Sequence, residues 1–178
     1  LISYPYNDCQ GLDAGLGTSA GYVYAIAGEG VAALAIDGVF IGSLTEFAGN
    51  SGYWLVATGG FSFSFNNSGS ECEELARTKS MPEEYKYSQS NQQAFFFVNN
   101  ATVRGEVLES DDLIIAYNGD QVVGSRYWNG DHFTDVPAMG LGLIGKIKDN
   151  GDLSRVEETG SNYCKAGDEV SFKVLDAS

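Results

Sequence analysis

The chain has 178 residues, of which 24 are acidic and 10 are basic, so its formal net charge is −14 at pH 7. Such a surface repels the phosphate backbone of nucleic acids, so we do not expect nucleic acid as a partner. Apolar residues make up 43% of the chain, which is too many for a disordered protein. No apolar run in the sequence is long enough to cross a bilayer.

Short strands joined by tight turns are predicted along the whole chain, because glycine is frequent (23 residues) and proline is scarce (3 residues). The predicted strands, in chain order, are 21–27, 31–36, 39–45, 53–58, 61–66, 94–99, 102–108, 113–117, 121–128, 141–147 and 170–175. Segment 61–66 alternates phenylalanine with serine, as a strand with one buried face would. Segment 113–117 is apolar throughout, which is typical of a strand covered on both faces.

Four dipeptides accept the positive φ angles of tight hairpin turns. They are Asp37-Gly38, Asn118-Gly119, Asn129-Gly130 and Asn150-Gly151. Four such turns are difficult to accommodate in a helical protein, so we predict an all-β fold with at most one or two short helices. The helical candidates are 10–17 and 70–79, and the second has its acidic residues first and its basic residues last, as the helix dipole favours.

A polar stretch without strand periodicity, at 68–90, separates two apolar regions of the chain. We therefore predict two small antiparallel β-sandwich or barrel-like modules in tandem. The first covers 1–67, the polar stretch 68–90 is the linker, and the second module covers 91–178.

Three short motifs mark the first half of the chain: Leu1 to Pro5 (LISYP), Ser43 to Phe47 (SLTEF) and Gly52 to Leu55 (GYWL). With these motifs, residues 1–66 resemble a GYW-type module found in surface and secreted proteins of marine and gliding bacteria. In that pattern the glycine allows a tight turn and the aromatic pair anchors the core.

The second half carries an acidic turn from Glu109 to Asp112, a YNGDxVVG-like hairpin from Ala116 to Gly124, and a late AGDEVSFKV strand from Ala166 to Val174. These residues are similar to a second module of the same kinds of protein, and some phage virion proteins also look similar. The resemblance implies non-catalytic β-sandwiches in surface architecture. We therefore expect a secreted chain that is extracellular, at the cell surface or in a virion.

The three cysteines, Cys9, Cys72 and Cys164, are widely spaced and form no CxxC pair. In a secreted chain they would make one disulfide and leave one free or intermolecular thiol. Three buried free thiols remain an alternative on the sequence alone.

No catalytic centre is predicted. His132 is the only histidine, so a His-rich metal site is excluded and a Ser-His-Asp triad would depend on this one residue. The cluster of Glu109, Asp111 and Asp112 could be a pair of hydrolytic carboxylates, but a solvated turn explains it more simply.

Acidic loops leave one metal hypothesis open, namely a structural calcium ion held by hard oxygen ligands. The candidate ligands are Asp111, Asp112, Asp131, Asp135, Asp149 and Asp152. None of these loops has EF-hand spacing, so metal-free turns are the simpler interpretation, and we expect no other cofactor.

Three successive phenylalanines, Phe95, Phe96 and Phe97, cannot all face one core, so at least one of them needs another partner. We therefore expect a structural protein of an extracellular assembly (a surface filament, an appendage or a virion component) whose copies form a homo-oligomer or a polymer. The alternative is an adhesin or carbohydrate-binding module that acts as a monomer. Its glycan would stack on Tyr127, Trp128 and His132. Packing in the core is nevertheless the favoured interpretation for Trp128, and more strongly for Trp54.

Overall fold

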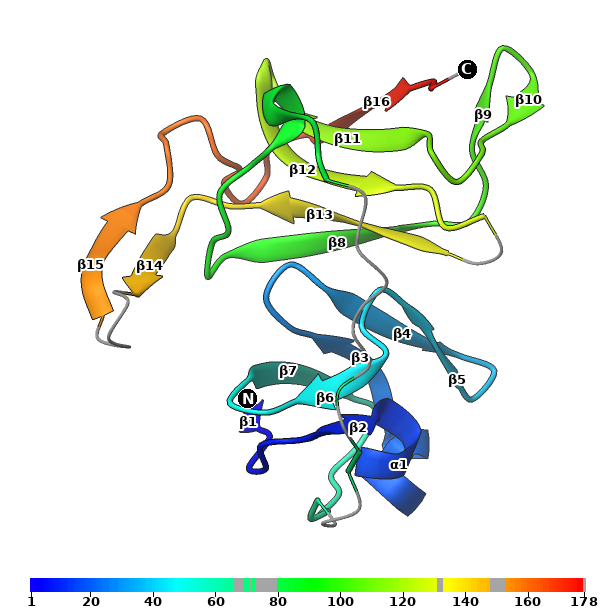
Figure 1. Cartoon of the computed structure of the whole chain (residues 1–178), viewed down its shortest axis with the longest axis vertical. Helices are drawn as coiled ribbons and strands as arrows, with labels where there is room; N and C mark the ends of the chain where they lie inside the picture. The colour runs from blue at the N-terminus through cyan, green and yellow to red at the C-terminus, as the bar shows by residue number, and fades with distance from the viewer. Residues whose placement is uncertain (66–68, 71, 73–79, 131–132, 148–152, 178) are drawn as a thin grey trace. The chain divides into compact units, whose positions relative to one another are not determined.

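The computed structural model describes residues 1–65, 69–70, 72, 80–130, 133–147 and 153–177. The chain divides into two compact units, Leu1–Ser80 and Met81–Ser178 (Figure 1). Short antiparallel strands are the main regular elements of each unit, so the prediction of an all-β protein made of small modules is confirmed.

Unit 1 contains a five-stranded antiparallel sheet with the order β1-β7-β3-β4-β5. Its strands are β1 (Ile2–Ser3), β7 (Gly52–Ala57), β3 (Val23–Ala27), β4 (Ala32–Ile36) and β5 (Val39–Gly42). The β4–β5 hairpin closes through Asp37 and Gly38, whose φ angles of 51° and 81° are those expected of this dipeptide. A second pair joins β2 (Cys9–Gly11) to β6 (Glu46–Ala48), and α1 (Leu12–Leu16) with the 3₁₀ helix η1 (Gly17–Tyr22) follows β2.

The core of unit 1 contains a cluster of aromatic rings. Phe47 is fully buried, and its ring lies 5.1 Å from that of Tyr53 and 5.1 Å from that of Phe65. The predicted strand at 61–66 is wrong, because residues 61–65 pair with no strand, although Phe61 and Phe63 also pack partly buried against this core. The alternation of phenylalanine and serine correctly indicates that one face of this segment is covered. It does not show that a neighbouring strand is present to pair with it. A disulfide between Cys9 and Cys72 closes the unit.

Unit 2 is built on a three-stranded and a two-stranded antiparallel sheet. The first has the order β12-β11-β16, with β12 (Gln121–Tyr127), β11 (Leu113–Asn118) and β16 (Ser171–Leu175); the second pairs β13 (Thr134–Met139) with β8 (Gln93–Val98). Two hairpins extend the unit, β9 (Thr102–Val103) with β10 (Glu106–Val107) and β14 (Leu143–Ile147) with β15 (Leu153–Glu158). Segment 102–108 is thus a hairpin that turns at Arg104 and Gly105, and not the single strand predicted.

The two sheets of unit 2 enclose one core. Ala116 and Val123 from the first sheet and Val136 and Ala138 from the second are all buried in it, together with Trp128. Strands β12 and β13 approach each other at Gly124, where an added Cβ atom would meet the carbonyl oxygen of Pro137. The sheets are therefore in contact along one side.

The end of the predicted linker packs on this unit. The Ser125 hydroxyl donates a hydrogen bond to the carbonyl oxygen of Tyr85 in the 3₁₀ helix η2 (Glu83–Tyr85). The Ser88 amide donates to the Tyr163 hydroxyl, and Tyr87 packs against the core. Residues 81–90 therefore belong to unit 2.

Two sequence predictions fall largely outside the described residues, namely the helix at 70–79 and the turn at Asn150-Gly151. The short helix predicted at 10–17 is present as α1. Across the ranges that the structure describes, no helix has the length and apolarity needed to cross a membrane.

Candidate functional site

The free edges of the two sheets of unit 2 come together at one place. Among the described strands, β8 pairs only with β13, and β16 pairs only with β11. Phe96 on β8 and Phe172 on β16 nevertheless meet edge to face, with ring centroids 5.0 Å apart and an interplanar angle of 72°. We call this place, formed by the unpaired edges of β8 and β16 with their two phenylalanines, the seam.

The registers place both rings on the core side of their sheets. Phe96 lies directly opposite Val136, and Phe172 lies directly opposite Ala116, and residues opposite each other in an antiparallel pair share a face. Val136 and Ala116 are completely buried in the core of unit 2. The two phenylalanines are 37% and 41% exposed, so the core reaches the surface at the seam.

Phe95 and Phe97 lie on the other face of β8, since side chains alternate along a strand. They are opposite Pro137 and Asp135, and both are half-buried. The structure therefore separates the three predicted interface phenylalanines, and Phe96 is the one at the seam. Its partner Phe172 was not predicted, although the spacing of Phe172 and Val174 by two residues is a signal that they share a face.

The carboxylates proposed as calcium ligands have other roles where the structure describes them. Both Asp112 oxygens accept backbone hydrogen bonds, from Glu109 at 2.8 Å and from Ala177 at 2.9 Å. Asp135 is buried and pairs with Arg126 at 3.4 Å. These carboxylates are engaged in hydrogen bonds and an ion pair within unit 2.

The other calcium candidates lie at an exposed turn or outside the described residues. Asp111 is exposed, and Asp131, Asp149 and Asp152 lie outside the described residues. Within the described ranges, a single group has its ligand-type atoms close enough for one metal ion, namely Cys9, Glu46 and Cys72. The two cysteines of that group form a disulfide, so their sulfur atoms are not thiolate ligands.

The glycan site predicted on one turn does not form as expected. Trp128 is 4% exposed and packs in the core of unit 2, so its ring is not available for stacking on a sugar. Tyr127 is half-buried, and His132 lies outside the described residues. Core packing, the alternative considered for Trp128, is what the structure shows.

Trp54 was predicted to lie in the core, and the structure shows it exposed. Trp54 on β7 is 46% exposed, whereas its neighbour Tyr53 is buried and accepts a hydrogen bond from the Ala48 amide at 2.8 Å. Alternation along β7 allows only one member of this aromatic pair to face the core. Of this pair, Tyr53 alone is buried in the core of unit 1.

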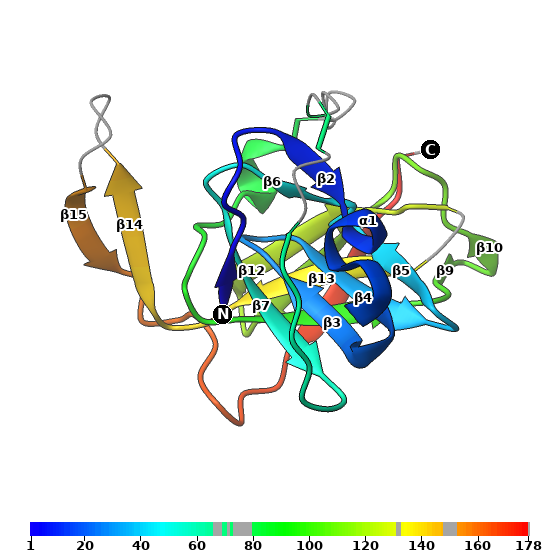
Figure 2. The ribbon, with the colours of Figure 1, turned by 90° about the horizontal axis from the view of Figure 1, so that it is seen from below.

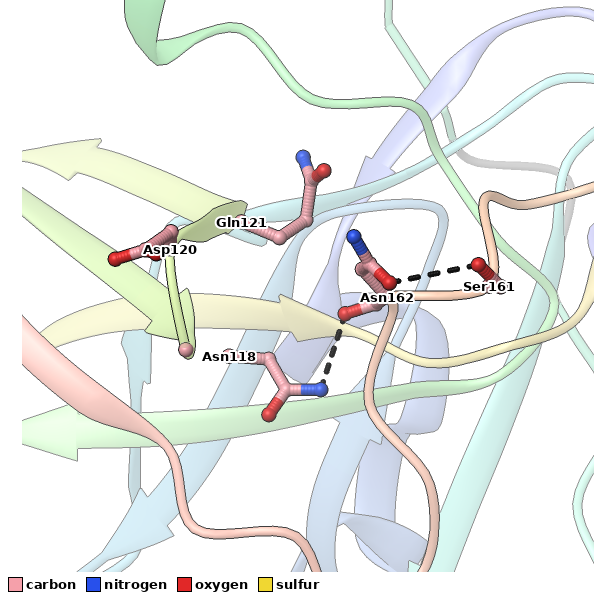
Figure 3. Close-up of a pocket in the computed structure, with 6 residues that line it drawn as sticks. Asn118, Asp120, Gln121, Ser161 and Asn162 are labelled. Carbon is pink, nitrogen blue, oxygen red and sulfur yellow. Dashed lines mark hydrogen bonds between the residues drawn. The ribbon is translucent and has the colours of Figure 1, made fainter.

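A shallow polar pocket of about 460 Å³ lies beside the β11–β12 turn (Figure 3). Its lining residues are Asn118, Gly119, Asp120, Gln121, Ser161 and Asn162. The Asn118 amide donates to the Asn162 carbonyl oxygen and to Asp168, both at 3.0 Å, so this side chain ties two loops together. The described lining offers amide, hydroxyl and carboxylate groups for hydrogen bonds.

Comparison of the chain with models of protein families, with curated proteins and with solved structures finds no match in any of the three. The resemblance to surface-protein modules therefore stays a prediction from the sequence.

Proposed function

We propose that the protein is a non-catalytic structural component of an extracellular assembly, on a cell surface or a virion, and that its copies associate by adding a strand at the seam. The observation that carries this proposal is the pair Phe96 and Phe172, two large apolar side chains exposed on unpaired strand edges. Unpaired edges present backbone donors and acceptors to another chain. Burial of the exposed rings by that chain would stabilise the contact.

The magnitudes favour a contact that includes backbone pairing. A phenylalanine carries roughly 200 Å² of surface, so the exposed parts of the two rings amount to about 150 Å². At about 25 cal/mol per Å², covering them contributes at most about 4 kcal/mol. Association costs about 4–15 kcal/mol in lost freedom, so the rings alone are insufficient and a hydrogen-bonded strand must add to them.

Charge also favours the seam as a place of self-association. Copies with a net charge of −14 repel one another, and the repulsion is least where the contact surface carries no acidic residue. Strand β8 has no charged residue, and β16 has only Lys173, which lies over the Tyr117 ring at 4.4 Å from its centroid. The two edge strands themselves therefore bring no acidic side chain into such a contact.

The test is the state of assembly of the Phe96→Ser variant, measured by light scattering after gel filtration and by electron microscopy. We expect the wild-type chain to form oligomers or ordered polymers, and the variant to lose them while keeping its cooperative unfolding transition. Val107→Ser is the matched control, because Val107 is 65% exposed on β10 of the same unit and is not at the seam. Equal loss of assembly and folding in Phe96→Ser, or a monomeric wild-type chain, would count against the proposal.

A second candidate function, binding of an uncharged glycan by a monomer, is favoured by one surface of unit 1. Trp54 and Val56 share a face of β7, opposite Ala27 and Ala25 of β3, and both are about half exposed, as is Tyr24 at the start of β3. Exposed aromatic rings suit the apolar face of a sugar. Binding on a glycan array that is lost in Trp54→Ala but kept in Phe96→Ser would support this function.

A further inference from the structure

Unit 1 brings two sulfur atoms and one carboxylate together. The Sγ atoms of Cys9 and Cys72 and a carboxylate oxygen of Glu46 all lie within 4.8 Å of one another. Cys9 belongs to β2, Glu46 belongs to β6, and Cys72 follows Ser70 in the chain. We call Cys9, Cys72 and Glu46 the Cys–Glu group.

The register of β2 with β6 explains why Glu46 reaches the cysteines. The two strands lie side by side (Figure 2), and Glu46 is directly opposite Gly11, which is two residues after Cys9. Glu46 is therefore the diagonal neighbour of Cys9 on the same face, a separation that a long side chain can span. Gly11 has no side chain, and an added Cβ atom there would meet no atom within 4 Å. The Glu46 side chain thus has room to extend across β2 toward Cys9.

Two backbone hydrogen bonds hold the segment before Cys72 against β2. The Cys9 amide donates to the Ser70 carbonyl oxygen at 3.0 Å, and the Ser70 amide donates to the Cys9 carbonyl oxygen at 2.9 Å. Neither bond involves a sulfur atom. Cys72 is two residues beyond Ser70, and two residues span at most about 7 Å. We therefore expect the two thiols to stay close together when the disulfide is reduced.

Two thiolates and one carboxylate are ligands that zinc accepts in proteins, with water as the fourth ligand of a tetrahedral site. With bonds of about 2.3 Å to sulfur and about 2.0 Å to oxygen, the ligand atoms of such a site are about 3.5–3.8 Å apart. The Glu46 oxygen would have to move by only about 1 Å, and the sulfur atoms would move apart once their bond is broken. Sulfur ligands select zinc over calcium, which takes oxygen ligands.

The charge of this part of unit 1 also favours a cation. Residues 1–65 include several acidic residues but no lysine, arginine or histidine. Asp8, directly before Cys9, accepts a hydrogen bond from the Tyr4 hydroxyl at 2.9 Å and places a second carboxylate on this part of the chain. A bound divalent cation would offset the repulsion among these negative groups.

We propose that the Cys–Glu group binds zinc whenever the Cys9–Cys72 disulfide is reduced, and that forming the disulfide releases the ion. The two thiolates and the Glu46 carboxylate are the three protein ligands. Every newly synthesised chain is reduced before its disulfide forms, so zinc would hold the same two segments of unit 1 together until oxidation replaces it. This inference goes beyond the proposed function and does not depend on the seam.

The exchange between the two forms is a thiol–disulfide reaction with an external dithiol. Cys72 is exposed whereas Cys9 is 1% exposed, so one thiolate of the dithiol attacks Cys72 Sγ, the bond between the two cysteines breaks, and Cys9 leaves as a thiolate. The second thiolate of the reagent then displaces Cys72 and closes the reagent's own disulfide. The protein gains two electrons and two protons, and zinc binding releases the two protons.

The experiment is a titration of the reduced full chain with Co²⁺, which takes the place of zinc and reports thiolate ligands by sulfur-to-cobalt charge-transfer absorption. All proteins carry Cys164→Ser, so that Cys9 and Cys72 supply the only thiols. They are reduced with a dithiol and freed of it by gel filtration without oxygen. We expect one Co²⁺ per reduced chain, displaced by one equivalent of zinc, and no charge-transfer absorption from the oxidised chain.

Variants assign the ligands. Cys9→Ser should abolish the charge-transfer absorption. Glu46→Gln keeps both thiols and should weaken Co²⁺ binding at least tenfold, since loss of a group that only supports a ligand already costs about 10–100-fold. Glu29→Gln, at an exposed position between β3 and β4, is the matched control and should bind as the parent does. Equal affinities of Glu46→Gln and Glu29→Gln would overturn the assignment of Glu46, and a reduced parent without charge-transfer absorption would overturn the site.

A stability measurement covers the case in which the reduced chain does not fold without metal. Zinc should raise the melting temperature of the reduced chain, or restore its near-ultraviolet circular dichroism if that signal is lost on reduction, because binding of the ion is then coupled to folding. The oxidised chain should be insensitive to zinc. A reduced chain that zinc neither stabilises nor refolds, or an oxidised chain that zinc stabilises equally, would contradict the proposal.

Discussion

Gly124 on β12 and Pro137 on β13 approach so closely that a Cβ atom at position 124 would lie 1.7 Å from the Pro137 carbonyl oxygen. The contact joins strands that share no hydrogen-bonded ladder, since β12 pairs with β11 and β13 pairs with β8. Next to it, the Arg126 guanidinium donates to the Asp135 carbonyl oxygen at 3.1 Å and so bridges the same two strands. The two sheets of unit 2 are therefore held at a separation that only glycine at position 124 permits.

The Gly124→Ala variant should unfold unit 2 much more easily than wild type. The clash is with backbone, which cannot rotate away as a side chain would, so we expect a loss of about 3 kcal/mol or more. Chemical denaturation followed by the fluorescence of Trp128, which is buried in this unit, measures the loss. Gly160→Ala is the control, because its nearest neighbouring atom, in the Tyr163 ring, is 3.9 Å from the added carbon. Equal stability of the two variants would contradict the close approach.

The disulfide between Cys9 and Cys72 should be a major source of stability for unit 1. The two residues are 63 positions apart in the sequence, and a cross-link of that span contributes about 4 kcal/mol by restricting the unfolded chain. Denaturation of the double variant Cys9→Ser and Cys72→Ser, followed by Trp54 fluorescence, should show a loss of this size. Cys164→Ser is the matched control and should leave unit 1 unchanged.

A thiol count provides an independent check on that pairing. The denatured chain should react with one equivalent of a thiol reagent before reduction and three after it. The single thiol belongs to Cys164, where burial raises the pKa and so slows the reaction of the native protein. Three reactive thiols without reductant would restore the alternative of three free cysteines.

The stability of unit 1 should fall in alkaline solution because of Tyr4. Burial, together with a hydrogen bond from its hydroxyl to Asp8 at 2.9 Å, raises the pKa of Tyr4 from 10.0 to about 12. The folded chain therefore keeps a proton that the unfolded chain releases, so this contribution is complete below pH 10 and is lost as pH rises from 10 to 12.

The measurement is the free energy of unfolding of unit 1 from pH 8 to pH 12 in wild type and in Tyr4→Phe, which cannot ionise at this position. The difference between the two proteins should shrink over the upper half of that range. Tyr22→Phe changes a tyrosine that is 51% exposed and should behave as wild type. A difference between wild type and Tyr4→Phe that is independent of pH would refute the assignment.

Asp112 should act as a structural residue and not as a calcium ligand. Asp112→Ala removes the acceptor of two backbone hydrogen bonds in a buried place, so we expect unit 2 to lose about 2–3 kcal/mol. Asp111→Ala, at the exposed neighbouring position, should have little effect. Millimolar calcium should raise the melting temperature of neither wild type nor variant, and a rise in wild type that Asp112→Ala abolishes would restore the calcium hypothesis.

The sequence alone determined the class of fold and several of its turns, because these depend on residues close together in the chain. Asp37 and Gly38 adopt the positive φ angles of a tight turn, and this preference is local to the dipeptide. Together with the apolar segments on either side, it predicts a hairpin. The apolar run 113–117 likewise predicted a strand covered on both faces, and its residues Leu113 to Ala116 are all buried in β11. For the candidate site, the sequence identified Phe96 as one of three residues.

Only the tertiary structure decided which strands pair and which faces are covered, because both depend on residues far apart in the chain. β13 was not predicted, and it contains Pro137, which has no amide hydrogen to donate. Among the described strands β13 has a ladder on one edge only, so it tolerates this residue. Trp54 and Trp128 have the same side chain, and one is exposed while the other is buried. Phe172 lies 76 positions after Phe96, and no local pattern predicts a contact across that separation.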